Sequence, residues 1–299
     1  MSATPPPPLL TLPSAPFAIL RRLEWHLRGA SEGVLAGEYR SAFRGRGIEF
    51  DQVVKYAFGD DVRDIDWNVT ARLGEPYRKR FIEEREVTVL LVFEDTPSLQ
   101  FGSGMRTKRE ALLELAGLLL LLGAMNRDRS GFIRTTPAGV AECIPPTRGR
   151  GALHHAAARL LSSPPPPITA GTQTAIPWAH LRRLAPRHSI LVWLNDFPPR
   201  PVPAEWSAAR SHFHTLGFRI DDPWERSLPP EIESFPAYDP IAGRLIYVEN
   251  NAASRAAHAR WREEREASWQ SLFPSTTRRL VASTNDILLD ALVRFFSKK

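Results

Sequence analysis

The chain has 299 residues, a hydrophobic content of 43% and a single cysteine, Cys143, so it can bury a sizeable core but can form no internal disulfide bond. Its formal charge of +6 permits anionic partners. The arginines are dispersed, however, and no block of five or six basic residues marks a nucleic-acid-binding tail.

No targeting or membrane-spanning segment stands out in the sequence. Residues 1–16 are rich in proline and lack the basic start and long apolar core of a secretory signal. The longest apolar run, from Leu115 to Met125, is well below the roughly 18 residues that would suggest a membrane span. We therefore expect a cytoplasmic protein with no transmembrane segment.

The first part of the chain predicts a tail followed by a small lobe. Residues 1–16 have the composition of a disordered segment. Residues 17–29 carry apolar side chains at helical spacing, and residues 37–50 alternate around a Gly-Arg-Gly turn that is typical of a hairpin. Residues 76–86 read as an exposed strand. We predict that residues 17–86 form one N-terminal lobe containing a helix and β-structure.

A dense polar stretch lies within this lobe. Four aspartates fall within seven residues: Asp60, Asp61, Asp64 and Asp66. Converging carboxylates of this kind could hold two metal ions in a hydrolase. A structural or partner-contact role is the other interpretation, in which an aspartate starts a helical turn, Arg63 and Arg72 bind carboxylates, and Trp67 anchors the turn in the core.

Residues 87–299 alternate strands with helices. Strands are predicted at 87–93, 131–135, 140–144, 189–194, 216–220, 244–248 and 278–282, and helices at 106–126, 151–161, from about 174 to 184, and at 204–214, 252–272 and 286–296. The second and third strands are expected to form a hairpin, and prolines 164–167 a stiff surface spacer. This alternation predicts an α/β fold with a mostly parallel sheet and helices on both faces.

Oxygen-bearing side chains follow two of these strands. Glu94, Thr96 and Ser98 come directly after the strand at 87–93, and Asp196 follows the strand at 189–194. Ligands of open α/β sheets bind just beyond the carboxyl ends of the strands. A carboxylate and two hydroxyls there suit a hard cation such as Mg²⁺, although Thr96 and Ser98 could instead only cap the next helix.

The order of these residues resembles the von Willebrand factor type A fold, a Rossmann-like sheet with a metal-ion-dependent adhesion site. In that family an Asp-x-Ser-x-Ser motif, a distant threonine and a distant aspartate surround one divalent cation. The resemblance implies that Glu94, Thr96, Ser98 and Thr174 hold the ion and that Asp196 binds it directly or through water. When Thr96 and Ser98 are aligned with the two hydroxyl positions of that motif, Glu94 stands where the family has Asp.

A longer match lies upstream and downstream of this motif. Gly59-Asp60-Asp61-x-Arg63-x-Ile65-Asp66-Trp67 with Ala71-Arg72, and Asp222-Pro223-x-Glu225, resemble the signature of the family called domain of unknown function 58. The resemblance covers roughly residues 36–296. It implies a bacterial, non-enzymatic adaptor or assembly factor that works with a MoxR-type AAA+ ATPase and its client proteins.

Three functions follow as hypotheses. The first is a protein-binding module in which a partner's Asp or Glu completes the coordination of an ion at Glu94. The second is a metal-dependent hydrolase that uses Asp60, Asp61, Asp64 and Asp66. The third is a basic nucleic-acid binder, whose affinity would fall steeply with salt.

Overall fold

The computed structural model describes residues 23, 24, 27, 39, 52–57, 62, 65, 67–80, 87–168, 174–239 and 244–297. By its internal contacts the chain forms two units. One consists of residues 44–86, and the other of residues 1–43 together with 87–299. The predicted tail at 1–16 and the predicted hairpin at 37–50 lie outside the described residues, apart from Tyr39.

The unit at 44–86 contains a short antiparallel strand pair and one short helix. Strand β1 (Gln52–Lys55) pairs with β2 (Tyr77–Arg80), and helix α3 (Trp67–Leu73) lies between them in sequence. The Thr70 hydroxyl accepts a hydrogen bond from the backbone N–H of Tyr77, which ties the helix to the pair. The expectation that Trp67 is a core anchor is wrong, because its side chain is 68% exposed and α3 buries none of its residues.

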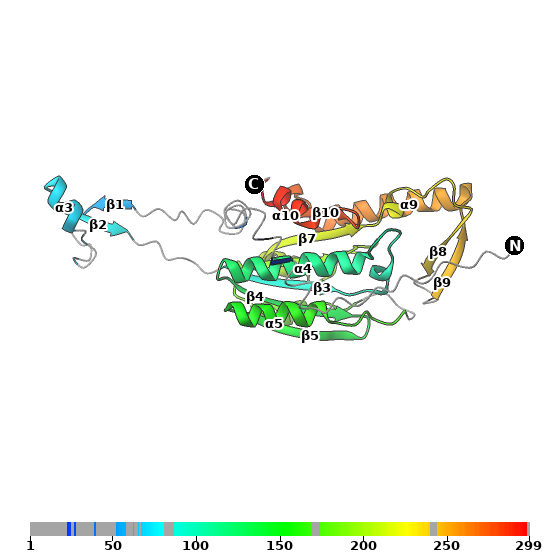
Figure 1. Cartoon of the computed structure of the whole chain (residues 1–299), viewed down its shortest axis with the longest axis horizontal. Helices are drawn as coiled ribbons and strands as arrows, with labels where there is room; N and C mark the ends of the chain where they lie inside the picture. Colours follow the sequence, from blue (N-terminus) through cyan, green and yellow to red (C-terminus); the bar gives the residue numbers. More distant parts are fainter. Residues whose placement is uncertain are drawn as a thin grey trace. The chain divides into compact units, whose positions relative to one another are not determined.

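The larger unit is built on one six-stranded sheet with the strand order β10-β7-β6-β3-β4-β5 (Figure 1). Its strands are β3 (Thr88–Glu94), β4 (Arg129–Thr136), β5 (Gly139–Thr147), β6 (Ile190–Asn195), β7 (His214–Asp221) and β10 (Arg279–Ser283). All neighbouring pairs are parallel except β4 and β5, which form the predicted antiparallel hairpin at one edge. The sequence-based prediction of a mostly parallel sheet is therefore confirmed.

Strand β3 is the centre of this sheet. Its residues, Thr-Val-Leu-Leu-Val-Phe-Glu, are all buried, as expected for an apolar strand that is covered on both faces. It pairs with β4 on one side and β6 on the other, and the chain moves outward from β3 in both directions. The carboxyl ends of β3 and β6 therefore meet at the point where the strand order reverses, which is the usual ligand position in open α/β sheets.

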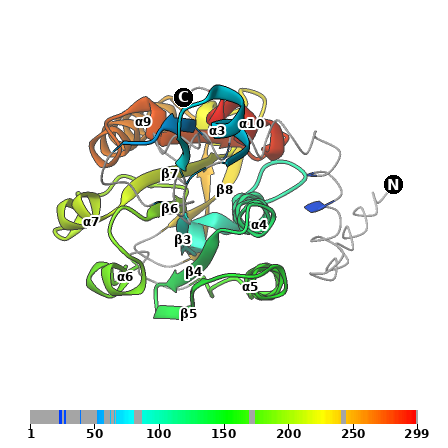
Figure 2. The same cartoon turned by 90° about the vertical axis from the view of Figure 1, so that its left-hand side faces the viewer.

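Helices cover both faces of the sheet, as the end-on view in Figure 2 shows. One layer contains α4 (Lys108–Met125), α5 (Arg150–Leu161) and α10 (Leu288–Phe296), and the other contains α6 (Trp178–Leu184), α7 (Trp206–His212) and α9 (Ala252–Leu272). Helix α9 packs closely on β7 because residue 217 is glycine. A Cβ atom there would lie 2.5 Å from the rings of Trp269 and Phe273.

Helix α4 is buried on nearly all sides rather than along one face. A capping box formed by Thr107 and Glu110 fixes its first turn. Its leucines pack against the sheet, α5 and α10, and also against Leu23 and Leu27 from the N-terminal part of the chain. Tyr39 belongs to the same core, with its ring 5.6 Å from that of Phe296. None of the described helices combines the length and apolar character needed to cross a bilayer.

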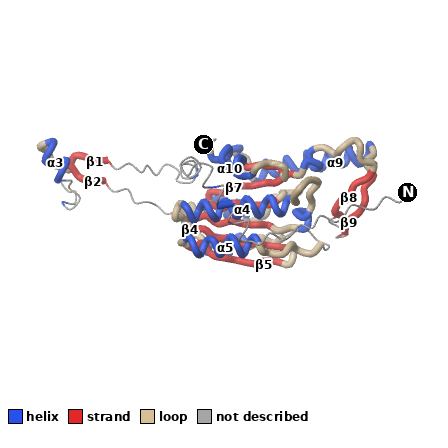
Figure 3. Tube along the Cα trace, viewed as in Figure 1, coloured by secondary structure: helices blue, strands red, loops and turns tan. Residues whose placement is uncertain are grey.

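Two sequence-based element assignments need correction. Residues 244–249 form β9, which pairs antiparallel with β8 (Ser234–Asp239) apart from the main sheet, as Figure 3 shows. Strand β8 was not predicted because it contains Pro236, and proline is rare within paired strands. The helix predicted from residue 174 begins only at Trp178. Pro177 explains this, because the residue before a proline is disfavoured in the helical conformation.

Candidate functional site

Glu94 lies at the carboxyl end of β3, where its carboxylate accepts hydrogen bonds from several side chains. Arg200 Nη1 lies 2.8 and 3.0 Å from its two oxygens, and the indole N–H of Trp193 donates to Oε2 at 2.9 Å. The hydroxyl of Thr174 donates to Oε1. Glu94 is buried, so this carboxylate has its charge balanced by Arg200 and both oxygens bonded.

A tight turn after β6 brings Arg200 to this position. Phe197 has a φ of +48°, a left-handed conformation that is rare for an aromatic residue, and its N–H donates to Asn195 Oδ1 at 2.7 Å. Ser268 on α9 donates to the backbone carbonyl of Arg200 at 2.8 Å. The guanidinium then lies over the rings of Trp193 and Phe197, 5.3 and 5.8 Å from their centroids.

The two hydroxyls of the predicted motif bond to each other. Thr96 Oγ1 and Ser98 Oγ are 2.9 Å apart, and Ser98 lies in the 3-10 helix η2 (Pro97–Gln100). The Asn195 amide donates to the Glu94 carbonyl at 2.8 Å and to Thr96 Oγ1 at 3.4 Å. Thr96 is the N-cap residue of η2, but its hydroxyl forms no capping hydrogen bond there, and the N-cap of α4 is Thr107.

Asp196 belongs to a second ion group, centred on the buried Lys108. Lys108 Nζ lies 2.7 Å from Asp196 Oδ2 and 2.5 Å from Glu225 Oε1. Burial disfavours the charged form of Lys108, but the two carboxylates outweigh it and raise the pKa of Lys108. Burial likewise disfavours ionised Asp196, but the charges of Lys108 and Arg265 outweigh it and lower the pKa of Asp196.

The signature residues Asp222 and Glu225 hold the loops around this group. They form the capping box of the short helix α8 (Pro223–Arg226). The Asp222 carboxylate also accepts from the backbone and hydroxyl of Ser103, at 2.8 and 2.5 Å, and from the Thr284 hydroxyl at 3.3 Å. Asp222 thus links α8 to the loop before α4 and to the segment before α10, and Glu225 links α8 to Lys108 on α4 and Arg265 on α9.

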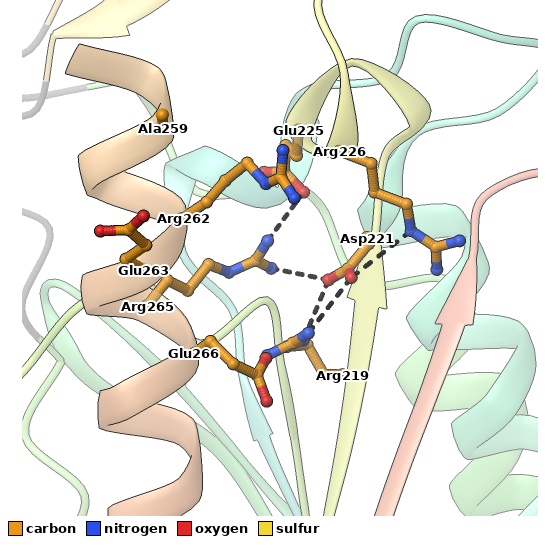
Figure 4. Close-up of a pocket in the computed structure, with 9 residues that line it drawn as sticks. All are labelled: Arg219, Asp221, Glu225, Arg226, Ala259, Arg262, Glu263, Arg265 and Glu266. Carbon is orange, nitrogen blue, oxygen red and sulfur yellow. Dashed lines mark hydrogen bonds and ion pairs between the residues drawn. The ribbon is translucent and has the colours of Figure 1, made fainter. Parts of the chain in front are cut away.

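The ion network continues to a cavity of about 410 Å³ at the carboxyl end of β7. Arg265 on α9 contacts Asp221 Oδ1 at 2.9 Å and Glu225 Oε2 at 3.4 Å, and Arg219 lies 3.0 Å from Asp221 (Figure 4). The cavity is lined by Arg219, Asp221, Glu225, Arg226, Ala259, Arg262, Glu263, Arg265 and Glu266. Eight of its nine lining residues are therefore charged.

Comparison with known proteins identifies the family. The family model described as "Protein of unknown function DUF58" matches residues 52–268, which is most of the chain. The chain belongs to the DUF58 family. This confirms the resemblance to domain of unknown function 58 seen in the sequence.

This DUF58 protein is similar to proteins that are described as uncharacterized. Uncharacterized proteins from Mycobacterium bovis and Mycobacterium tuberculosis are 29% identical to it over 216 residues, covering 71% of this chain and 67% of theirs. Among solved structures, the PilB minor pilin of Streptococcus sanguinis has 12% identity and a TM-score of 0.36. The match covers 75% of this chain and 62% of the pilin. An uncharacterized membrane spanning protein from Vibrio fischeri has 12% identity and a TM-score of 0.24, with coverage of 70% and 95%.

The other DUF58 signature residues belong to the unit at 44–86. Gly59, Asp60, Asp61, Arg63, Asp64 and Asp66 lie outside the described residues, so their predicted roles stay predictions. Trp67 and Arg72 lie on α3 and are both exposed. Among the residues that the structure describes, no group of three or more His, Cys, Asp or Glu side chains could hold a metal ion.

The predicted metal ligands do not fit one divalent ion in this arrangement. Glu94 lies with Thr174, and Ser98 lies with both Thr96 and Asp196, whose Oδ1 is buried with no hydrogen-bond partner among the described residues. However, Glu94 is paired with Arg200 and Asp196 with Lys108. An ion at Glu94 would have to displace a guanidinium that is 18% exposed, and would be repelled by it while it remained. Within the described residues, the cations beside Glu94 and Asp196 are therefore protein side chains, Arg200 and Lys108.

We expect the melting temperature of the wild-type chain to be the same in excess Mg²⁺ and in excess EDTA. An ion that bound only the folded state would raise it. Glu94→Gln leaves the partly buried Arg200 charge without its partner and should lower the melting temperature equally in both conditions. A saturable rise with Mg²⁺ that Glu94→Gln abolished would contradict this assignment. Differential scanning fluorimetry measures both.

The sequence did not lead us to the basic residues of this site, which are Lys108, Arg109, Arg200 and Arg265. Lys108 and Arg109 occupy the first turn of α4, where basic residues are unfavourable to the helix dipole, and such a placement is a signal of buried ion pairs. Arg265 is likewise the buried member of an otherwise polar stretch of α9. Arg200 follows two prolines in a loop, and nothing in its local sequence marks it.

Proposed function

We propose that this DUF58 protein is a cytoplasmic, non-enzymatic adaptor with a von Willebrand factor A-like fold, which binds a MoxR-type AAA+ ATPase and its client proteins. The strand order, with β3 central and one antiparallel edge strand, is compatible with that fold. The observation that carries the proposal is the pairing of the acidic groups at the carboxyl edge of the sheet.

Each of these acidic groups is already bound to a basic side chain. Glu94 pairs with Arg200, Asp95 with Arg109, and Asp196 with Lys108. A general acid or base needs a pKa near the working pH, whereas the pKa of Asp196 is lowered and that of Lys108 is raised. Carboxylates that are each held in an ion pair support a fixed binding surface for a partner more than they support proton transfer.

Affinity capture from a bacterial lysate tests the proposal. The full chain is the bait, an unrelated α/β protein is the control bait, and mass spectrometry identifies what is retained. We expect a AAA+ ATPase of the MoxR type, retained with Mg²⁺ and also with EDTA because the site contains its own cations. Mixing the two purified proteins should then give a complex by size-exclusion chromatography. Absence of a complex between the purified proteins would refute the proposal.

A further inference from the structure

We propose that the charged cavity at the carboxyl end of β7 is a binding site for an acidic side chain of a protein partner. This inference deepens the proposed adaptor function and rests on it. The recognising groups are Arg226 and Arg262, which approach the cavity from α8 and α9.

The floor of the cavity is paired internally. Asp221 is 5% exposed and contacts Arg219 and Arg265 at 3.0 and 2.9 Å. Arg219 also lies 3.0 Å from Glu266, and Glu225 is shared between Arg265 and Lys108. The charges of these groups are paired with one another, although Asp221 Oδ1 and Arg219 Nε form no hydrogen bond with any described residue, so the floor offers no unpaired charge to a ligand.

The rim of the cavity is different, because its two guanidiniums lack close partners. Arg226 Nε is 3.7 Å from Asp221, and the Arg226 side chain is 53% exposed. Arg262 is exposed and forms no hydrogen bond or ion pair with any residue that the structure describes. Glu263 also lines the cavity, but Figure 4 shows its carboxylate directed to the other side of α9 from Arg262. The lining as a whole has four arginines and four acidic residues, and among the described residues Arg226 and Arg262 are the lining arginines without a close carboxylate.

The shape and chemistry of the cavity suit a carboxylate on a peptide. Ala259, one turn before Glu263 on α9, presents only a methyl group to the cavity and leaves room beside Arg262. A volume of about 410 Å³ accommodates an acidic side chain with its neighbouring backbone. Guanidinium groups bind carboxylates in two parallel hydrogen bonds, and arginine is enriched where protein partners bind. The side chains of the floor are already held in ion pairs, so little further ordering of them is needed on binding.

Fluorescence anisotropy with a labelled, C-terminally amidated hexaglutamate peptide tests the site in the full chain. We expect saturable binding by the wild-type protein and a loss of about tenfold in affinity for Arg226→Gln and for Arg262→Gln. Ala259→Leu should also weaken binding, because it fills the cavity without changing a charge. Arg260→Gln is the matched control: it removes an exposed arginine two residues from Arg262 that does not line the cavity, and it should change affinity by less than about twofold.

Several results would overturn the inference. They are an absence of hexaglutamate binding to the wild-type chain, an equal loss in Arg260→Gln, or full competition by inorganic phosphate at the peptide's concentration. A hexaglutamate with a free C-terminus that bound while the amidated peptide did not would show a terminal-carboxylate site and would also overturn it. Melting curves of each variant confirm that the fold is intact.

The outcome is separable from that of the adaptor proposal. Retention of the ATPase by wild-type and Arg226→Gln/Arg262→Gln baits alike would refute the cavity as the partner site and leave the adaptor function standing. Arginine-dependent peptide binding without any ATPase complex would support the cavity and refute the adaptor function.

Discussion

Lys108→Met is expected to lower the free energy of unfolding by about 3–5 kcal/mol, because it leaves the buried Asp196 carboxylate without its paired cation and removes one of the two cations at Glu225. Lys108 is 2% exposed and bonds to Asp196 and Glu225 together. Methionine fills a similar volume, so the loss reports the charge rather than a cavity. Urea unfolding followed by circular dichroism measures it, with Arg159→Met as the control. Arg159 is 59% exposed in its pair with Glu142, and its loss should cost about 0–1 kcal/mol.

A combined variant separates the charge from the packing. Lys108→Met with Asp196→Asn and Glu225→Gln removes the whole ion group and should recover much of the lost stability, since neutral replacement of a buried ion pair is often tolerated. Exposed ion pairs contribute about 0–1 kcal/mol to the free energy of unfolding. A loss within that range for Lys108→Met alone would contradict the assignment of a buried ion group.

The pH dependence follows from the same group. The pKa of Asp196 is lowered by folding, so its contribution is complete above the unfolded value of about 3.9 and is lost as the pH falls through the folded value. The pKa of Lys108 is raised, so its contribution is complete below about 10.4 and is lost as the pH rises through the folded value. Lys108→Met should therefore make the free energy of unfolding depend less on pH at both the acidic and the alkaline end of the profile.

The centre of the fold was predictable because it depends on local pattern. The apolar run before Glu94 marks β3, and such a run followed by a helix predicts a buried parallel strand. The acidic half of the site was predictable too, because strand ends in one sheet meet at one edge. Glu94 and Asp196 both lie at that edge.

The basic residues of the site were not predictable, because they are distant in sequence from the carboxylates that they bind. Arg200 lies 106 residues from Glu94, and Lys108 lies 88 residues from Asp196. A lone arginine in a loop is usually solvated, and only the turn at Phe197 brings Arg200 back onto β3. A motif that resembles a metal site gives no indication that a guanidinium stands beside its carboxylate. Strand β8 was missed for a local reason, the proline within it.

The contacts of the proline run at 164–167 were also not predictable from the sequence, and they involve the arginines that bind Asp95. It was predicted as a surface spacer, but the Pro164 carbonyl accepts from Arg109 and Arg134, and the Pro166 carbonyl accepts from Gln100. Arg109 also donates to the carbonyl and hydroxyl of Ser163. These contacts depend on Asp95, which holds both arginines.

Asp95→Asn is therefore the second change with a large expected effect, a loss of about 3–5 kcal/mol of folding free energy. The Asp95 carboxylate is fully buried and binds Arg109 through two bonds of 2.9 Å and Arg134 at 3.1 Å. Asparagine keeps the shape but removes the only anion that the structure describes between two buried guanidiniums. Each arginine would then be repelled by the other in a medium that screens poorly.

Arg134→Met provides the contrast that makes this prediction specific. It keeps the two-bond pair of Asp95 with Arg109 and removes the second cation, whose Nε is buried with no hydrogen-bond partner among the described residues. Its cost should be about 1 kcal/mol or less, because a one-to-one buried pair remains. Comparable losses for Arg134→Met and Asp95→Asn in urea unfolding would show that the cluster contributes through packing. A large loss for Asp95→Asn alone would show that the balance of charge holds β3, β4, α4 and the proline run together.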